Sequence, residues 1–86
     1  MDSYKINFKR SAEKDLRQIS NLFLRQLIQK TKSLAINPRP AGVQMLKGEN
    51  RYFRIRHGDY RIIYEIQEIE KIVHIIKIGH RRDIYD

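Results

Sequence analysis

The chain has 86 residues, and its 18 lysines and arginines against 10 aspartates and glutamates give a formal net charge of +8. This length holds one domain with a modest core, so we expect a single domain over residues 1–86. The lack of cysteine excludes disulfides and thiolate metal sites, and without a signal peptide or a membrane-spanning apolar run we expect a cytoplasmic protein.

The positive charge favours a polyanionic partner. Each phosphate that a lysine or arginine neutralises releases condensed counterions, which adds affinity. Charge alone leaves a merely soluble basic surface equally open. A membrane surface is less favoured, because the basic residues are spread over segments that we expect to be strands and do not form one face of an amphipathic helix.

The first half of the chain predicts a strand followed by two helices. Residues 4–8 alternate between apolar and polar side chains, as in a half-buried strand. Ser11 can cap the next helix, and Ser20 with Asn21 breaks the helical pattern into two antiparallel helices. The second helix must stop at Asn37, because a proline disfavours helical geometry in the residue before it. The apolar positions at helical spacing are Leu16, Ile19, Phe23, Leu27 and Leu34.

The second half predicts an antiparallel meander. Residues 37–42 form a loop, after which Met45 and Leu46 return to the core. Three strands follow, at residues 52–56, 60–66 and 72–78, separated by short turns. The last two are apolar at nearly every position, as expected for central strands covered on both faces. The predicted fold is α+β, with two antiparallel helices on one face of a four-stranded, mainly antiparallel sheet.

Arginines gather on the predicted strands. Alternation along a strand places Tyr52, Arg54 and Arg56 on one face and directs Phe53 and Ile55 to the other. Arg61 follows a tight turn and is close enough to join them, although its facing depends on the turn register. Any one of these arginines could instead pair with a carboxylate (Asp59, Glu65 or Glu49). Three adjacent guanidiniums repel one another without an anion, so we favour a phosphate site.

A second basic cluster, His80 to Arg82, lies shortly before Tyr85. His80 is equally consistent with an exposed turn residue and with a catalytic group. Tyr85 can pack the tail or stack on a base. His57 and His74 lack metal-ligand spacing, and we predict no metal site.

Three segments together resemble the signature segments of RelE toxins in the RelE/ParE superfamily, the bacterial and archaeal toxins of toxin–antitoxin pairs. They are residues 54–56 (Arg-Ile-Arg), 58–64 (Gly-Asp-Tyr-Arg-Ile-Ile-Tyr) and 78–85 (Ile-Gly-His-Arg-Arg-Asp-Ile-Tyr). The order of elements extends the resemblance over essentially the whole chain. It implies a ribosome-dependent endonuclease that needs no cofactor, cuts messenger RNA in the ribosomal A site beside ribosomal RNA, and is inhibited by a cognate antitoxin.

The resemblance also implies residue roles. Arg61 and Arg81 match arginines that act on the scissile phosphate, and Tyr85 matches a tyrosine that aligns or activates the attacking hydroxyl. Arg54 and Arg56 stand where the best-known members have two lysines, and arginine cannot serve as a general base.

Two further positions bear on which residue could act as the general base. Some related toxins place a glutamate near position 44, where this chain has Gln44, which cannot accept the proton. His80 is the best titratable candidate that is left. Further RNA contacts are expected from the remaining basic and aromatic residues near these segments, which are Lys47, Arg51, Tyr52 and Arg82.

The implied chemistry needs no metal ion, because RNA supplies the nucleophile. The 2′-hydroxyl attacks the adjacent phosphorus, expels the 5′-oxygen and leaves a 2′,3′-cyclic phosphate, while the protein orients the attack and stabilises the added charge. Two alternatives are a ParE-like toxin that inhibits DNA gyrase and a non-catalytic RNA-binding module. ParE-type proteins share the fold without needing the basic set, so the arginines and Tyr85 favour the nuclease.

Overall fold

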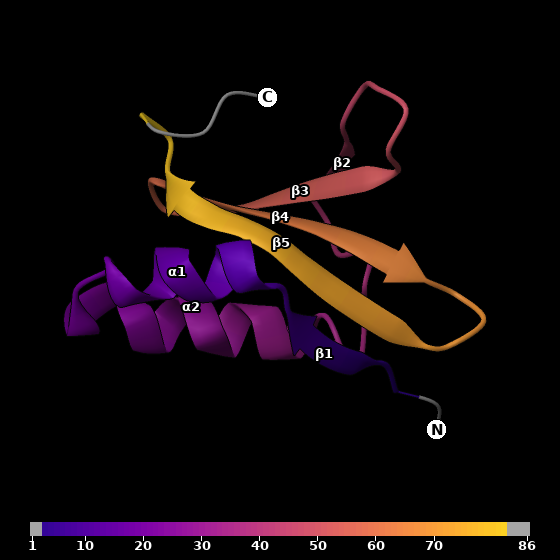
Figure 1. The fold of residues 1–86 in the computed structure, drawn as a ribbon, viewed down its shortest axis with the longest axis horizontal. Coiled ribbons are helices and arrows are strands. Elements are labelled where there is room, and N and C mark those ends of the chain that lie inside the picture. The colour runs from indigo at the N-terminus through magenta and orange to yellow at the C-terminus, as the bar shows by residue number, and fades with distance from the viewer. Residues whose placement is uncertain (1–2, 83–86) are drawn as a thin grey trace.

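A computed structural model describes residues 3–82 of the chain, so Tyr85 lies outside the described residues. Figure 1 shows two helices on one side of a twisted sheet. The predicted helices and the four predicted strands are all present, with a further two-residue strand between them. In chain order the elements are β1 (Lys5–Phe8), α1 (Arg10–Arg17), α2 (Asn21–Ser33), β2 (Gln44–Met45), β3 (Tyr52–His57), β4 (Tyr60–Gln67) and β5 (Ile72–His80).

The sheet has five strands in the order β1-β5-β4-β3-β2, which corrects the predicted four. β3, β4 and β5 form the expected antiparallel meander, and β1 adds to β5 in parallel. The extra strand β2 pairs Gln44 with Arg54 and Met45 with Phe53. Two residues are too few for an alternating pattern, so β2 has no signal in the sequence.

α1 covers the part of β5 that β1 leaves open. β1 pairs with β5 only as far as Ile75, after which the chain turns into α1. Ser11 does not cap the helix as predicted, because it lies within the first turn and its hydroxyl donates to the Ile76 carbonyl at 2.5 Å. One turn later, the Asp15 carboxylate accepts the Ile78 N–H at 3.0 Å. These bonds satisfy backbone groups that an exposed strand edge would leave unpaired.

α2 ends at Ser33, four residues before the predicted stop at Asn37. Turns continue over residues 34–36, and the Ala35 carbonyl accepts the Tyr4 N–H at 2.8 Å, which ties this segment to the start of β1. The break before Asn21 is at the predicted place, with Ser20 as the residue before the helix. Neither described helix is long and apolar enough to cross a membrane.

The core lies between the helices and one face of the sheet. Its fully buried side chains include Leu27, Leu34, Ile62, Tyr64, Val73 and Ile75. Met45 is 61% exposed, so the prediction that it returns to the core is wrong. β5 alternates between buried Val73 and Ile75 and the less buried His74, so it is not covered on both faces as predicted. The sheet face opposite the helices is not covered by a helix, although Arg54 and Ile63 on it are buried, and we call it the open face.

Side-chain hydrogen bonds also hold the 37–40 loop against the C-terminal end of β4. The buried Tyr64 hydroxyl donates to the Pro38 carbonyl at 2.6 Å, and burial raises the pKa of Tyr64 to about 12. Glu68 accepts hydrogen bonds from Tyr4 at 2.7 Å and from Arg39 at 2.6 Å. These two bonds lower the pKa of the Glu68 carboxyl. The loop is thus held away from the opposite end of the sheet, where the arginines gather.

Candidate phosphate-binding site

The arginines lie on the open face of the sheet. β3 and β4 pair so that Arg56 is directly opposite Arg61, while Arg54 is opposite Ile63. Phe53 and Ile55 point the other way and belong to the core, as the alternation predicted. The register also decides the facing of Arg61, which the sequence left open. Arg56 and Arg61 are cross-strand neighbours, and like charges in directly opposite positions destabilise a sheet.

Arg81 completes a hollow with this pair. The hollow is about 90 Å³ and is lined by Arg56, Arg61, Arg81 and the Gly58–Asp59 turn between β3 and β4. The turn is possible because Gly58 has a φ of 60°, which favours glycine. Asp59 holds Arg81 in place, since its carbonyl accepts the Arg81 N–H at 2.7 Å and its carboxylate lies 3.8 Å from Arg81 Nε.

Arg54 is a buried cation beneath this cluster. It is only 4% exposed and donates to the Gln44 side-chain oxygen on β2. Burial lowers the pKa of Arg54, and the neighbouring Arg56 and Arg61 lower it further. An arginine stays protonated in spite of such a shift, so the shift reports that the site disfavours its own positive charge. An anion in the hollow would offset the part of that penalty that comes from Arg56 and Arg61, which is the electrostatic property expected of a phosphate site.

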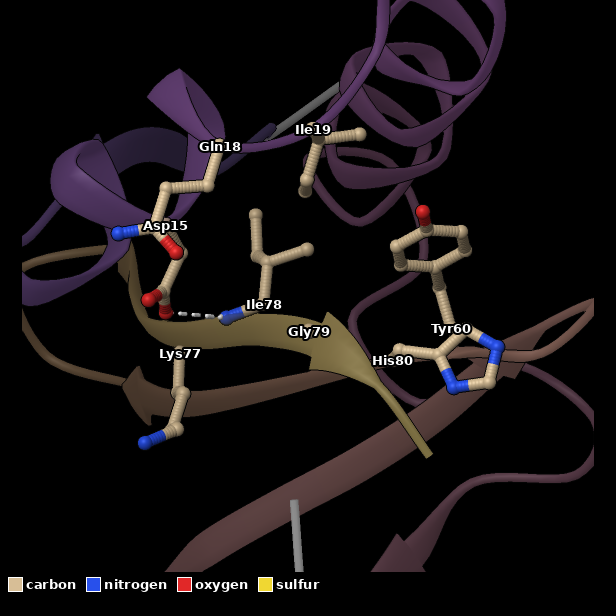
Figure 2. A pocket seen from close by; sticks show the side chains of 8 residues that line it. All are labelled: Asp15, Gln18, Ile19, Tyr60, Lys77, Ile78, Gly79 and His80. Atoms are coloured by element: carbon tan, nitrogen blue, oxygen red, sulfur yellow. Dashed lines mark hydrogen bonds between the residues drawn. The ribbon is translucent and has the colours of Figure 1, made fainter. Parts of the chain in front are cut away.

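His80 lies on the other side of the sheet from these arginines. It is paired with Tyr60 across β4 and β5, and the two rings meet edge to face at 5.6 Å. Figure 2 shows Tyr60 and Ile78 directed toward the helices and Lys77 directed away from them. His80 Nδ1 accepts the Arg82 N–H at 3.2 Å, and its Nε2 lies 3.9 Å from the Asp59 carboxylate. The structure therefore brings Arg56, Arg61 and Arg81 together in one hollow, whereas His80 lies on the helix side of the sheet.

The residues expected to make further RNA contacts are spread around the site. Lys47, Arg51 and Arg82 are exposed, the first two in the connection between β2 and β3. Tyr52 is half-buried and paired with Glu65, two residues along β3 from Arg54, so it shares the open face.

Two residues with a part in the site were missed from the sequence. In the sequence Gln44 is only a poor substitute for a general base, yet its side chain accepts a hydrogen bond from Arg54. Asp59 is a possible partner of the strand arginines by sequence, whereas in the structure its backbone and carboxylate both lie beside Arg81. For Asp59 the Gly-Asp turn was the available signal. The turn joins β3 to β4, and β5 pairs with β4, so a residue in the turn lies close to the C-terminal end of β5.

The other two histidines have partners within the fold. His57 lies 3.1 Å from the Gln26 side-chain oxygen on α2, and His74 lies 2.9 Å from the Asn7 amide on β1. Between residues 3 and 82, no three His, Asp or Glu side chains are grouped in a way that could hold a metal ion.

Comparison with known proteins identifies the family. Residues 6–85 match the family model described as the ParE toxin of type II toxin–antitoxin systems. The chain is 28% identical over 83 residues to Toxin RelG of Mycobacterium tuberculosis, and the match covers 95% of each protein.

Solved structures agree with this result. The RelBE2 toxin–antitoxin complex of Mycobacterium tuberculosis contains a chain that matches with a TM-score of 0.85 and 27% identity, covering 96% of this chain and 97% of that one. The intact RelBE complex of E. coli matches with a TM-score of 0.77 and 25% identity, covering 91% and 96%. The chain belongs to the ParE toxin family of type II toxin–antitoxin systems and is, within the RelE/ParE superfamily, a RelE family toxin.

Proposed function

We propose that this toxin is an endoribonuclease that cuts messenger RNA in the ribosomal A site. The observation that carries the proposal is the hollow on the open face, where Arg56, Arg61 and Arg81 converge beside the buried Arg54. Guanidiniums bind phosphate oxygens bidentately. The sheet positions Arg56 and Arg61 before the substrate arrives, and Arg81 directly follows β5, where the Asp59 carbonyl accepts its N–H. Such a preorganised cluster stabilises the charge that develops on a phosphate during transfer.

The proposed reaction is an attack by the substrate on itself. The 2′-oxygen forms a bond to the adjacent phosphorus, the bond to the 5′-oxygen breaks, and the products are a 2′,3′-cyclic phosphate and a 5′-hydroxyl. One proton leaves the 2′-hydroxyl and one reaches the departing 5′-oxygen. Arg61 and Arg81 bind the scissile phosphate, while Arg56 and Arg54 add positive potential beneath it. No metal ion is required in this scheme.

In this proposal the arginines of the hollow do not transfer protons, and other groups carry out that step. We leave His80 out of the phosphate site, because its ring lies with Tyr60 on the helix side of the sheet. Tyr85, outside the described residues, is proposed to align the 2′-hydroxyl. The arginines of the hollow cannot accept a proton, and the one carboxylate in its lining, Asp59, lies 3.8 Å from Arg81 Nε. We therefore propose that the ribosome positions the codon, since positioning can lower a barrier by several kcal/mol. Messenger RNA and ribosomal RNA are accordingly the proposed RNA partners, in the cytoplasm.

A cognate antitoxin is the proposed protein partner. The matching structures from Mycobacterium tuberculosis and E. coli are toxin–antitoxin complexes, which supports this partner. An acidic antitoxin segment that covers the arginine hollow would block the phosphate site, and such a segment can fold as it binds.

The test is a translation extract in which message cleavage is mapped by primer extension. With purified toxin, primer extension should stop at new 5′ ends inside translated codons, and the same RNA without ribosomes should be cut poorly. Efficient cutting of naked RNA would contradict ribosome dependence, and intact message in a translating extract would contradict the nuclease.

A gyrase inhibitor is the second candidate, favoured by the family model for ParE toxins that matches residues 6–85. A plasmid supercoiling assay separates the two functions. A nuclease leaves gyrase active at toxin concentrations that cut message, whereas a gyrase inhibitor stops supercoiling and leaves message intact. A plain RNA-binding module would do neither.

A further inference from the structure

A second hollow lies behind the arginine site, on the helix side of the sheet. It measures about 280 Å³, and its lining includes Phe23 and Gln26 of α2, the Gly58–Asp59 turn, and the rings of His57, Tyr60 and His80. In Figure 1 the turn between β3 and β4 lies at the same end of the sheet as the C-terminal end of β5. The volume is near the lower end of small-molecule sites, so it suits one flat ring system.

The walls of this hollow are aromatic. The Phe23 and Tyr60 rings are 5.4 Å apart and tilted by 41°, and His80 meets Tyr60 edge to face. Phe23 is 39% exposed although it is a large apolar side chain. Aromatic rings and imidazoles with accessible faces are the surfaces on which proteins stack unpaired bases of RNA.

Polar groups at the rim supply both donors and acceptors. His57 Nε2 is 3.1 Å from the Gln26 oxygen and must donate to it, which leaves Nδ1 of the neutral ring as an acceptor and the Gln26 amide N–H groups as donors. His80 Nδ1 accepts from Arg82, so its Nε2 carries the hydrogen in the neutral ring. A base edge with mixed donors and acceptors fits this rim.

The two hollows share the Gly58–Asp59 turn, one on each side of it. A phosphate bound by Arg56, Arg61 and Arg81 therefore lies next to an aromatic pocket that a neighbouring nucleotide can reach around the turn. Phosphate contacts carry no sequence information and stacking accepts every base, whereas hydrogen bonds to a base edge distinguish one base from another.

We propose that the hollow formed by Phe23, Gln26, His57, Tyr60 and His80 binds one unstacked nucleobase of the RNA whose phosphate occupies the arginine hollow, and that it contributes to codon preference. This inference rests on the proposed function, because it takes the same RNA as the ligand. It gives His57 and His80 a role in base recognition.

Binding can be tested without cleavage. Nucleoside 5′-monophosphates and inorganic phosphate are titrated into the purified toxin, and the aromatic resonances of Phe23, His57 and His80 are followed by NMR. We expect these resonances to shift with a nucleotide and to shift far less with phosphate. Perturbation confined to the arginines, with unchanged aromatic resonances, would overturn the pocket whether or not the toxin is a nuclease.

Specificity is tested by mapping cleavage sites across many messages with Phe23→Ala and Gln26→Ala. Phe23→Ala removes a stacking contact that every base can make and should slow cleavage at low toxin concentration by at least about fivefold at all sites. Gln26→Ala removes donors to the base edge and should weaken the base preference at one position near the cut. Phe23→Leu keeps the apolar volume without the ring and should resemble Phe23→Ala. Both substituted positions are exposed, so the fold should tolerate them. An unchanged rate with Phe23→Ala and an unchanged preference with Gln26→Ala, beside a wild type that cuts, would overturn the pocket and leave the nuclease intact.

Discussion

Arg56 lies where positive charges are concentrated, so its removal should stabilise the fold and weaken phosphate binding. It is exposed, stands opposite Arg61 and contributes to the lowered pKa of Arg54. We expect Arg56→Gln to raise the free energy of unfolding by on the order of 0.5 kcal/mol at low salt, with the gain fading as salt screens the charges. Urea unfolding measures this difference. Arg25→Gln on α2, which removes an exposed arginine outside the cluster, is the control, and equal stabilisation by both variants would contradict the account.

Tyr64 should make stability depend on pH in the alkaline range. Its folded pKa is raised to about 12 by burial, so the neutral phenol is favoured in the fold. The stabilisation is therefore complete below the unfolded pKa of about 10 and is lost as the pH rises toward 12. Tyr64→Phe should remove this pH dependence and, by losing the bond to Pro38, cost about 1 kcal/mol at neutral pH. Denaturant unfolding across this pH range checks both effects, and a mutant as pH-dependent as the wild type would refute the assignment.

Sequence alternation predicted the facing of Arg54 and Arg56, because apolar and charged side chains alternate from Phe53 to Arg56. The position of His80 was harder to see. It stands two residues after the buried Ile78 and so shares its face, but the neighbouring Ile75 and Ile76 hide the alternation. The alternation breaks at Ile75 and Ile76 because the register of β4 and β5 shifts between Ile63 and Tyr64. A bulge of this kind depends on the partner strand, which a single segment does not reveal.

At the scale of elements, α1 depends on its attachment to the edge of β5. An eight-residue helix is marginal by itself, and the Asp15 bond to the Ile78 N–H fixes its last turns to the sheet. We expect Asp15→Ala to cost about 1 to 2 kcal/mol of unfolding free energy, since it leaves that N–H unpaired. Asp15→Asn retains an oxygen acceptor and should cost less. Amide hydrogen exchange at Ile78 reports the bond directly, and equal protection in all three proteins would contradict this role.

The misjudged elements have a common cause. Ser11 has the composition of a helix cap, yet the unpaired edge of β5 offers its hydroxyl a carbonyl instead. β2 exists only because β3 passes beside Gln44 and Met45. In each case a distant strand decided the local structure, whereas the two helices and the meander, which have longer periodic patterns, were predicted in kind and order although not in every bound.

At the scale of the whole molecule, positive charge is not confined to the arginine hollow. Seven basic and two acidic residues lie between Lys9 and Ser33, the segment that contains both helices. Arg61→Ala should therefore reduce affinity for RNA by less than about tenfold at low salt, because the remaining charge still attracts phosphates. Fluorescence anisotropy with labelled RNA at several salt concentrations measures this. Complete loss of binding would show that the hollow alone supplies affinity.

The central claim is that the arginine hollow stabilises the transition state, and the single-turnover cleavage rate on programmed ribosomes tests it most directly. Arg61→Ala and Arg81→Ala should each slow cleavage by about a hundredfold or more while the proteins stay folded. Arg25→Ala, exposed on α2, should cut within about threefold of the wild type. If the Arg61 and Arg81 variants cut as fast as Arg25→Ala, the hollow is not the catalytic site.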